Sequence, residues 1–209
     1  MKSFHSIRNP LHRPIRTAFA VVAIAAVPVG AVAVPALAGQ TTPSTTTATT
    51  AAATTTTMCP TGWGSLPEAN NRMSAAKLTN VRTGRHACFD RIVFDLAGKP
   101  TGYHVSYVKN VYTDGQGALV PLRGGAKLQL VVRGADYNDA GVPTYKPANR
   151  RELTNVTGYQ TFRQVAYAGS FEGQTTVGLG VRARLPFRVF TLTGPGTTTR
   201  VVVDVAHHW

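Results

Sequence analysis

RIVFDLA at residues 91–97 recurs 109 residues later as RVVVDVA at residues 200–206, and this repeat decides how the fold is built. Both copies read Arg-x-Val-x-Asp-x-Ala, with an aliphatic residue or Phe at every x. Such alternation is typical of a β-strand, whose successive side chains point to opposite faces of a sheet. The residues predicted to face the core are Ile92, Phe94 and Leu96 in the first copy and Val201, Val203 and Val205 in the second.

The other face of each copy carries one arginine and one aspartate: Arg91 with Asp95, and Arg200 with Asp204. Residues four apart on one strand are roughly 13 Å apart, too far for the two to pair. If the copies are antiparallel neighbours with residue 91 opposite residue 204, Arg91 meets Asp204 and Arg200 meets Asp95. If they lie in different sheets, the repeat marks a duplication with two equivalent outer faces. The sequence leaves both arrangements open.

The rest of the chain also alternates in short runs, which Gly- and Pro-containing turns separate. No segment sustains a helical period for three turns, although a short helical turn is allowed near residues 66–72. This pattern predicts an all-β fold, an antiparallel sandwich or barrel. One irregular segment, residues 135–155, is expected to be either functional or loosely ordered. The predicted strands are 77–82, 88–96, 103–108, 126–133, 164–171, 175–182, 187–192 and 199–206.

The first 38 residues have the layout of a secretory signal peptide. Four basic residues precede a stretch without charge at 17–38, and Ala36-Leu37-Ala38 before Gly39 is a small-x-small cleavage signal. The alternative is an uncleaved membrane anchor, since residues 18–38 are nearly long enough to span a bilayer. We expect cleavage, and no stable membrane insertion after it, because Pro and Gly interrupt the apolar stretch.

A Thr- and Ala-rich segment, residues 39–58, follows the signal peptide. Its part at 41–57 contains no charge and no large apolar side chain, so it cannot bury enough surface to offset the entropy lost on ordering. We therefore predict a disordered linker at 39–58 and one folded domain at 59–209.

The folded part contains the only two cysteines, Cys59 and Cys88. In an exported protein an even number of cysteines predicts a disulfide, which here would add roughly 3–4 kcal/mol in the chain-entropy model. The alternative is a thiol nucleophile at Cys88, because His86 would share its strand face. Export and the second cysteine argue against that alternative.

The chain is strongly basic, with a formal net charge of +13. The signal peptide holds four of the basic residues and no acidic ones, so the remainder keeps +9, which is 13 less four. A basic exported domain suits an anionic surface such as a cell wall, an acidic glycan or lipid headgroups, and export excludes nucleic acid. All seven tyrosines follow residue 58. Because tyrosine stacks on sugars and arginine binds carboxylates, peptidoglycan fits both residue types; alternatively, the arginines only keep the domain soluble.

No catalytic or metal-binding pattern stands out in the sequence. His207 and His208 are adjacent, so on a strand they point to opposite faces, and no zinc-type spacing occurs; we predict no metal and no cofactor. Glu172 is the acid most suited to hydrolysis, but we expect it to cap a hairpin or to pair with an arginine. Gly178 and Gly180 are followed by no helix, which excludes a nucleotide-binding loop. No serine lies in a nucleophile-elbow pattern, so we expect that the protein is not an enzyme.

RIVFDLAG, SFEGQTTVGLGV, LPFRVFTL and RVVVDVAH resemble the AMIN and AMIN-like domains of exported bacterial proteins, over most of residues 77–207. The AMIN-like, actinobacterial-looking variety is the most similar. The resemblance implies a β-sandwich of two similar sheets, a role in envelope localisation, often through peptidoglycan, and a repeat that marks corresponding positions in two related sheets. Two features depart from the family pattern: the sequence holds no amidase or secretin module, and no lipidation cysteine follows the signal peptide.

These observations predict a secreted, non-catalytic, cell-wall-associated β-sandwich that binds peptidoglycan through an Arg/Tyr-bearing β face. In this prediction Arg91 and Arg200 contact carboxylates, while Asp95 and Asp204 orient them or bond sugar hydroxyls. The alternative is a protein–protein interaction module that presents its edge strands or residues 135–155 to an envelope partner. A third hypothesis is a hydrolase that uses Glu172.

Overall fold

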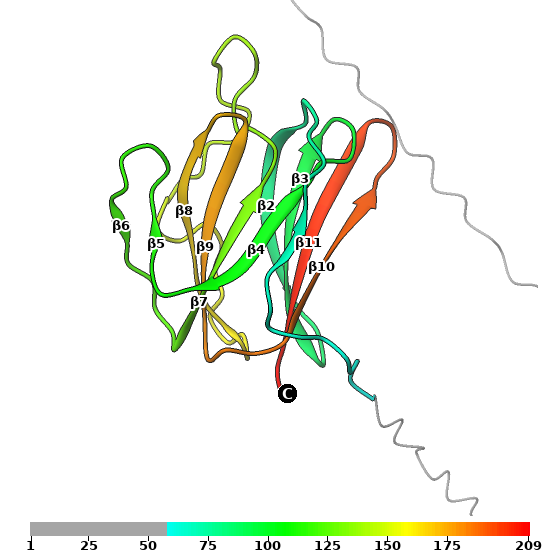
Figure 1. The fold of residues 1–209 in the computed structure, drawn as a ribbon, viewed down its shortest axis with the longest axis vertical. Coiled ribbons are helices and arrows are strands. Elements are labelled where there is room, and N and C mark those ends of the chain that lie inside the picture. The colour runs from blue at the N-terminus through cyan, green and yellow to red at the C-terminus, as the bar shows by residue number, and fades with distance from the viewer. Residues whose placement is uncertain (1–57) are drawn as a thin grey trace, which may run out of the picture. The chain divides into compact units, whose positions relative to one another are not determined.

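Two antiparallel sheets pack face to face in the part of the chain that this computed structural model describes, residues 58–209 (Figure 1). The strands are β1 (Glu68–Asn70), β2 (Lys77–Arg85), β3 (Phe89–Ala97), β4 (Tyr103–Val108), β5 (Val111–Tyr112), β6 (Leu119–Val120), β7 (Ala126–Val132), β8 (Phe162–Phe171), β9 (Gln174–Val181), β10 (Phe187–Thr193) and β11 (Thr198–Ala206). One sheet has the order β1-β4-β7-β9-β8, the other β10-β11-β3-β2, and β5 pairs with β6. The predicted all-β sandwich is confirmed.

Each of the eight predicted strands forms, with ends that differ by at most three residues. Sequence reasoning missed β1, β5 and β6 because two or three residues are too few to show an alternation. β1 occupies the place where a short helical turn was allowed. The predicted signal peptide and all of the predicted linker except Met58 lie outside the described residues. No helix within residues 58–209 is long and apolar enough to cross a membrane.

The two copies of the repeat, β3 and β11, are antiparallel neighbours in one sheet. Arg91 lies opposite Asp204 and Asp95 opposite Arg200, which is the first of the two arrangements that the sequence left open. The expectation that the copies mark corresponding positions in two sheets is wrong. The shared pattern instead serves a cross-strand match, in which each strand supplies the counter-charge of the other.

The core lies between the sheets and is built from the alternating faces that the sequence predicted. Ile92, Phe94 and Val203 are fully buried in it, as are the other inward residues of both repeat copies. Phe162 on β8 and Phe187 on β10 also belong to this core. Burying a side chain of this size contributes roughly 1.5–3 kcal/mol, so this apolar layer is the main source of stability.

A buried aspartate ties the two sheets together at one end of the core. Asp90 on β3 accepts hydrogen bonds from the backbone N–H groups of Thr161 and Phe162, at 2.6 and 3.0 Å, where the chain enters β8 of the other sheet. His207 Nε2 lies 3.2 Å from the second oxygen of Asp90. Because a buried carboxylate is tolerated only when its oxygens are bonded, these contacts fix how the sheets meet at this end.

The outer side of the five-stranded sheet is covered by the β5-β6 hairpin and the segment that follows it (Figure 1). Gly178 and Gly180 on β9 make this possible. A Cβ atom on Gly180 would lie 1.9 Å from the carbonyl oxygen of Arg123, and one on Gly178 would lie 2.8 Å from Leu122 Cδ1. These glycines therefore let the chain cross close to the sheet, which accounts for the Gly-x-Gly pattern.

The irregular segment 135–155 is ordered by backbone hydrogen bonds. The N–H groups of Thr144 and Tyr145 both donate to the carbonyl of Asp136, at 2.7 and 3.1 Å. Leu153 donates to Val165 on β8, and Tyr167 on β8 donates to the carbonyl of Arg150. Of the two expectations for this segment, loose order is therefore wrong.

The close crossing over β9 predicts a strong effect of Gly180→Ala. The added methyl group meets a backbone oxygen that cannot rotate away, so we expect a loss of about 2–3 kcal/mol in the free energy of unfolding. Urea denaturation measures it. Gly84→Ala on β2 is the control, because its Cβ would lie 3.8 Å from His86, an ordinary contact. Equal stability of the two variants would contradict the packing described here.

Candidate functional site

The outer side of the four-stranded sheet carries four arginines and two aspartates, and we call this group the arginine face. Among residues 58–209, no second sheet covers this side. Every strand of the sheet contributes, because alternation turns its charged side chains outward, away from the core. The members are Arg82 on β2, Arg91 and Asp95 on β3, Arg188 on β10, and Arg200 and Asp204 on β11.

Asp204 lies at the centre of the face and is fully buried. Both of its cross-strand neighbours are arginines, Arg91 on β3 and Arg188 on β10. Arg91 donates from Nε and Nη2 to the two carboxylate oxygens, at 2.6 and 2.9 Å. Arg188 Nε donates to Oδ2 at 2.9 Å, and its Nη2 lies at 2.9 Å from the same oxygen. The hydrogen bonds to Asp204 raise the pKa of Arg91, which further stabilises its charged form.

Aromatic rings also contact the same two guanidinium groups. Arg188 Cζ lies 4.5 Å from the ring centre of Trp63 and 5.0 Å from that of Phe190. Arg91 Cζ lies 5.1 Å from the Phe89 ring and 5.5 Å from the Phe190 ring. Each cation–π contact contributes roughly 0.5–1 kcal/mol at a partly exposed site. Together with Asp204, these rings leave the two arginines little freedom of orientation.

The fixed arginines still present hydrogen-bond donors to solvent. The side chains of Arg91 and Arg188 are 25% and 40% exposed. Within residues 58–209, neither Nη1 group donates a hydrogen bond. A guanidinium group with free, oriented N–H groups is a binding site for a carboxylate or a phosphate.

The second aspartate of the face, Asp95, is more open. Arg82 donates to it from Nε and Nη2 at 2.8 and 3.1 Å, and these hydrogen bonds raise the pKa of Arg82. Arg200 Nε lies 3.6 Å from Asp95, at ion-pair rather than hydrogen-bond distance. Arg200 therefore keeps most of its donors for an external partner.

A model of the AMIN-like domain family matches residues 76–207, a range that contains both repeat copies and the whole arginine face. The chain belongs to the AMIN-like family. AMIN-like domains are associated with the cell envelope and with peptidoglycan, and the family indicates an extracytoplasmic location. The chain matches no curated protein and no solved structure.

The four predicted site residues of this AMIN-like domain come together on one face, paired as Arg91 with Asp204 and Arg200 with Asp95. Asp204 is fully buried, so of its two predicted roles it can only orient arginines. Asp95 is partly exposed and can also meet a ligand. Whether these residues bind a ligand stays a prediction.

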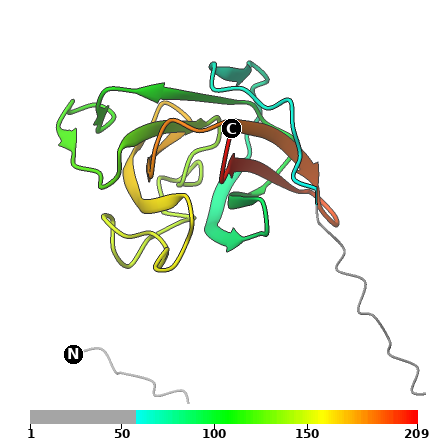
Figure 2. The same ribbon diagram turned by 90° about the horizontal axis from the view of Figure 1, so that it is seen from below.

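Sequence reasoning missed Arg82, Arg188 and the aromatic residues of the site. Arg188 and Phe190 had a usable signal, since they alternate with core residues on a predicted strand. Trp63 had none, because its place beside β10 depends on tertiary contacts. It comes from the coil segment before β1, which Figure 2 shows in cyan.

The tyrosines do not belong to the arginine face, so the prediction of an Arg/Tyr-bearing face is wrong in this respect. Tyr103, Tyr107, Tyr145 and Tyr159 pack against the core. The Tyr107 hydroxyl donates to the carbonyl of Leu185 at 2.8 Å. Phenol groups suit such rim positions because the ring is buried while the hydroxyl finds a partner. The aromatic residues of the face are Trp63, Phe89 and Phe190 instead.

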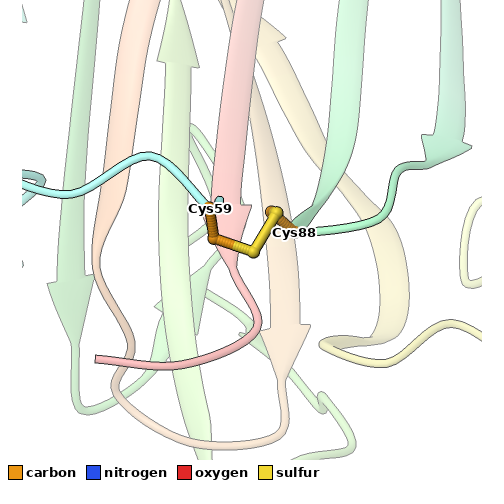
Figure 3. Close-up of a disulfide and its surroundings, with 2 residues drawn as sticks. All are labelled: Cys59 and Cys88. Carbon is orange, nitrogen blue, oxygen red and sulfur yellow. A yellow bond between two sulfur atoms is a disulfide. The ribbon is translucent and has the colours of Figure 1, made fainter. Parts of the chain in front are cut away.

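The predicted disulfide between Cys59 and Cys88 is confirmed, and it excludes the thiol nucleophile (Figure 3). Figure 3 shows that the disulfide joins the coil before β1 to the residue before β3. Trp63, four residues after Cys59, lies 5.6 Å from the Phe89 ring. The disulfide thus helps to hold Trp63 against Arg188.

Other polar residues that the sequence singled out lie in structural positions. Glu172 and Gly173 form the two-residue turn between β8 and β9, both with positive φ, so the hairpin role expected for Glu172 is confirmed. His207 is buried beside Asp90, whereas His208 is exposed. Among residues 58–209, no three His, Cys, Asp or Glu side chains are grouped as metal ligands would be.

The two aspartates of the arginine face differ in burial, so they predict different effects on stability. Asp204→Asn leaves a buried amide under two arginines, and we expect a loss of about 1–3 kcal/mol in the free energy of unfolding. Asp95→Asn breaks partly exposed pairs and should cost less than about 1 kcal/mol. Thermal and urea denaturation compare the two. A larger loss for Asp95→Asn would contradict the central position of Asp204.

Removing the disulfide should destabilise the AMIN-like domain strongly. The cysteines are separated by 29 residues, and closing a loop of that length stabilises by about 3–4 kcal/mol in the chain-entropy model. Urea denaturation of the Cys59→Ser/Cys88→Ser variant measures the loss, with the reduced wild-type protein as the matched control. A loss below about 1 kcal/mol in both would show that the crosslink adds little.

Proposed function

We propose that this domain is a non-catalytic binding module of the cell envelope whose arginine face holds carboxylates of peptidoglycan. One observation carries the proposal: Arg91 and Arg188 are fixed by buried Asp204 and by aromatic rings, yet keep outward N–H groups without a partner in the described residues. Arg91 and Arg188 share the single carboxylate of Asp204. The second guanidinium brings a positive charge that the protein leaves uncompensated.

The charge and spacing of the face suit a polymer with repeated acidic groups. Four arginines against two aspartates leave a net charge of +2. The two clusters, around Asp95 and Asp204, are displaced along the strands by four residues, roughly 13 Å. Peptide stems of peptidoglycan carry carboxylates, and its sugars offer apolar ring faces that can stack on Trp63 and Phe190. Simultaneous contacts along one polymer raise the overall affinity without any single strong contact.

Binding rather than catalysis is what these side chains support. Arginine keeps its proton at all physiological pH values, so it serves neither as a general base nor as a nucleophile. Asp204 is buried and bonded on both oxygens, which withholds it from acid–base chemistry. The face therefore offers fixed positive charge and hydrogen-bond donors.

Co-sedimentation with purified peptidoglycan tests this proposal. Arg188→Gln/Arg200→Gln removes two exposed charges but leaves Asp204 with Arg91 and Asp95 with Arg82, so the fold should persist. We expect its dissociation constant to rise at least tenfold, because each charge-assisted contact contributes roughly 1.5–3 kcal/mol. The binding of the wild-type protein should largely survive high salt, because the arginines also bind by directed hydrogen bonds.

The matched control is Arg72→Gln/Arg151→Gln, which removes the same charge from two exposed positions outside the face. It should bind like the wild-type protein. Equal losses in both variants, abolished alike by salt, would mean that the basic surface adheres to the wall without a specific site.

The second candidate function is a protein–protein interaction module. Tyr112 and Leu119 favour it, because they are cross-strand neighbours on the β5-β6 hairpin and both are about half exposed. Two large apolar side chains side by side on a projecting hairpin suit a protein partner. If neither the wild-type protein nor any of the variants above binds the wall, this function is favoured over the first.

A further inference from the structure

A pocket that shares no residue with the arginine face lies between the segment 136–150 and β8. Its cavity has a volume of about 430 Å³, within the range of small-ligand sites. The side chains that bear on its chemistry are Asp136, Tyr137, Tyr145, Lys146, Arg150 and Tyr167. It thus brings together tyrosines and cations, the combination that the sequence predicted for the arginine face.

Hydrogen bonds and stacking fix the walls of this pocket. The Tyr167 hydroxyl donates to Asp136 Oδ2 at 2.6 Å. Arg150 Cζ lies 4.7 Å from the centre of the Tyr167 ring, and the Arg150 carbonyl accepts the Tyr167 N–H at 2.7 Å. Burial and the hydrogen bond to Asp136 raise the pKa of Tyr167, so its hydroxyl remains a donor to Asp136 at physiological pH.

The pocket keeps polar groups that nothing in the described chain uses. Within residues 58–209, Arg150 and Lys146 form no ion pair, although both are exposed at the rim. Asp136 Oδ1 accepts no hydrogen bond from those residues either, since the bond from Tyr167 goes to the other oxygen. Two cations without an ion pair in the described residues, one acceptor that those residues leave unused, and tyrosine rings therefore line one cavity.

We propose that this pocket binds an acidic sugar, a pyranose ring that carries a carboxylate. The carboxylate pairs with Arg150 and Lys146, a ring hydroxyl donates to Asp136 Oδ1, and the apolar face of the sugar lies against tyrosine. This site does not depend on the arginine face, and its ligand is a single sugar unit rather than a polymer. Such a sugar occurs as muramic acid in peptidoglycan and as a uronic acid in other glycans.

Titration of the full chain with three sugars tests this proposal. Binding is monitored by the NMR shifts of the Tyr137 and Tyr145 amides. N-acetylmuramic acid and glucuronic acid carry a carboxylate, whereas N-acetylglucosamine is neutral. We expect the better of the two acids to bind at least about fivefold more tightly than the neutral sugar. Which acid binds more tightly distinguishes the source of the ligand.

Arg150→Gln should weaken binding of that acid about tenfold, and Lys146→Gln should also weaken it. The matched control is Arg151→Gln, which removes the same charge from the adjacent, exposed residue outside this pocket. Thermal denaturation verifies that each variant is folded. The proposal is wrong if the neutral sugar binds as tightly as both acids, if none of the sugars binds, or if Arg151→Gln reduces the affinity as much as Arg150→Gln does.

Discussion

The buried carboxylate of Asp204 is the constraint on which the outer side of the four-stranded sheet depends. A charge without solvent contact must be paired and bonded, and Arg91 and Arg188 on the two flanking strands meet that demand. The same contacts link β10, β11 and β3 in one register. A slip by one residue would turn each charged side chain into the apolar core, so the pairing of charges and the burial of the core select the same arrangement.

The outer sides of the two sheets differ in what packs against them. The β5-β6 hairpin and its following segment cover the outer side of the five-stranded sheet, and Gly178 and Gly180 give them room. On the outer side of the other sheet, guanidinium groups stacked on aromatic rings take the place of a covering layer within the described residues. This asymmetry, within a family associated with the cell envelope, is why we place ligand binding on the arginine face.

Much of the fold is predictable because the strands are long enough to alternate, and the repeat even predicts the register of β3 with β11 as one of two options. The choice between those options depends on tertiary packing, which a single sequence does not display. The site is less predictable for the same reason. Arg91 and Arg200 follow from the repeat, whereas Trp63 reaches Arg188 only because a disulfide and a bridge from Gly64 to Phe187 place its coil there. The number of tyrosines was a misleading guide to the binding face, because phenol rings pack at the rim of the core as readily as they line a binding face.

The most direct test of the central claim is an NMR titration of the ¹⁵N-labelled protein with soluble peptidoglycan fragments, which follows the Nε–H signals of the arginines. Binding at the arginine face predicts that the signals of Arg91, Arg188 and Arg200 shift together and saturate at one affinity, while that of Arg72 stays in place. Shifts confined to other arginines, or spread evenly over all of them, would contradict the claim that this face recognises the wall.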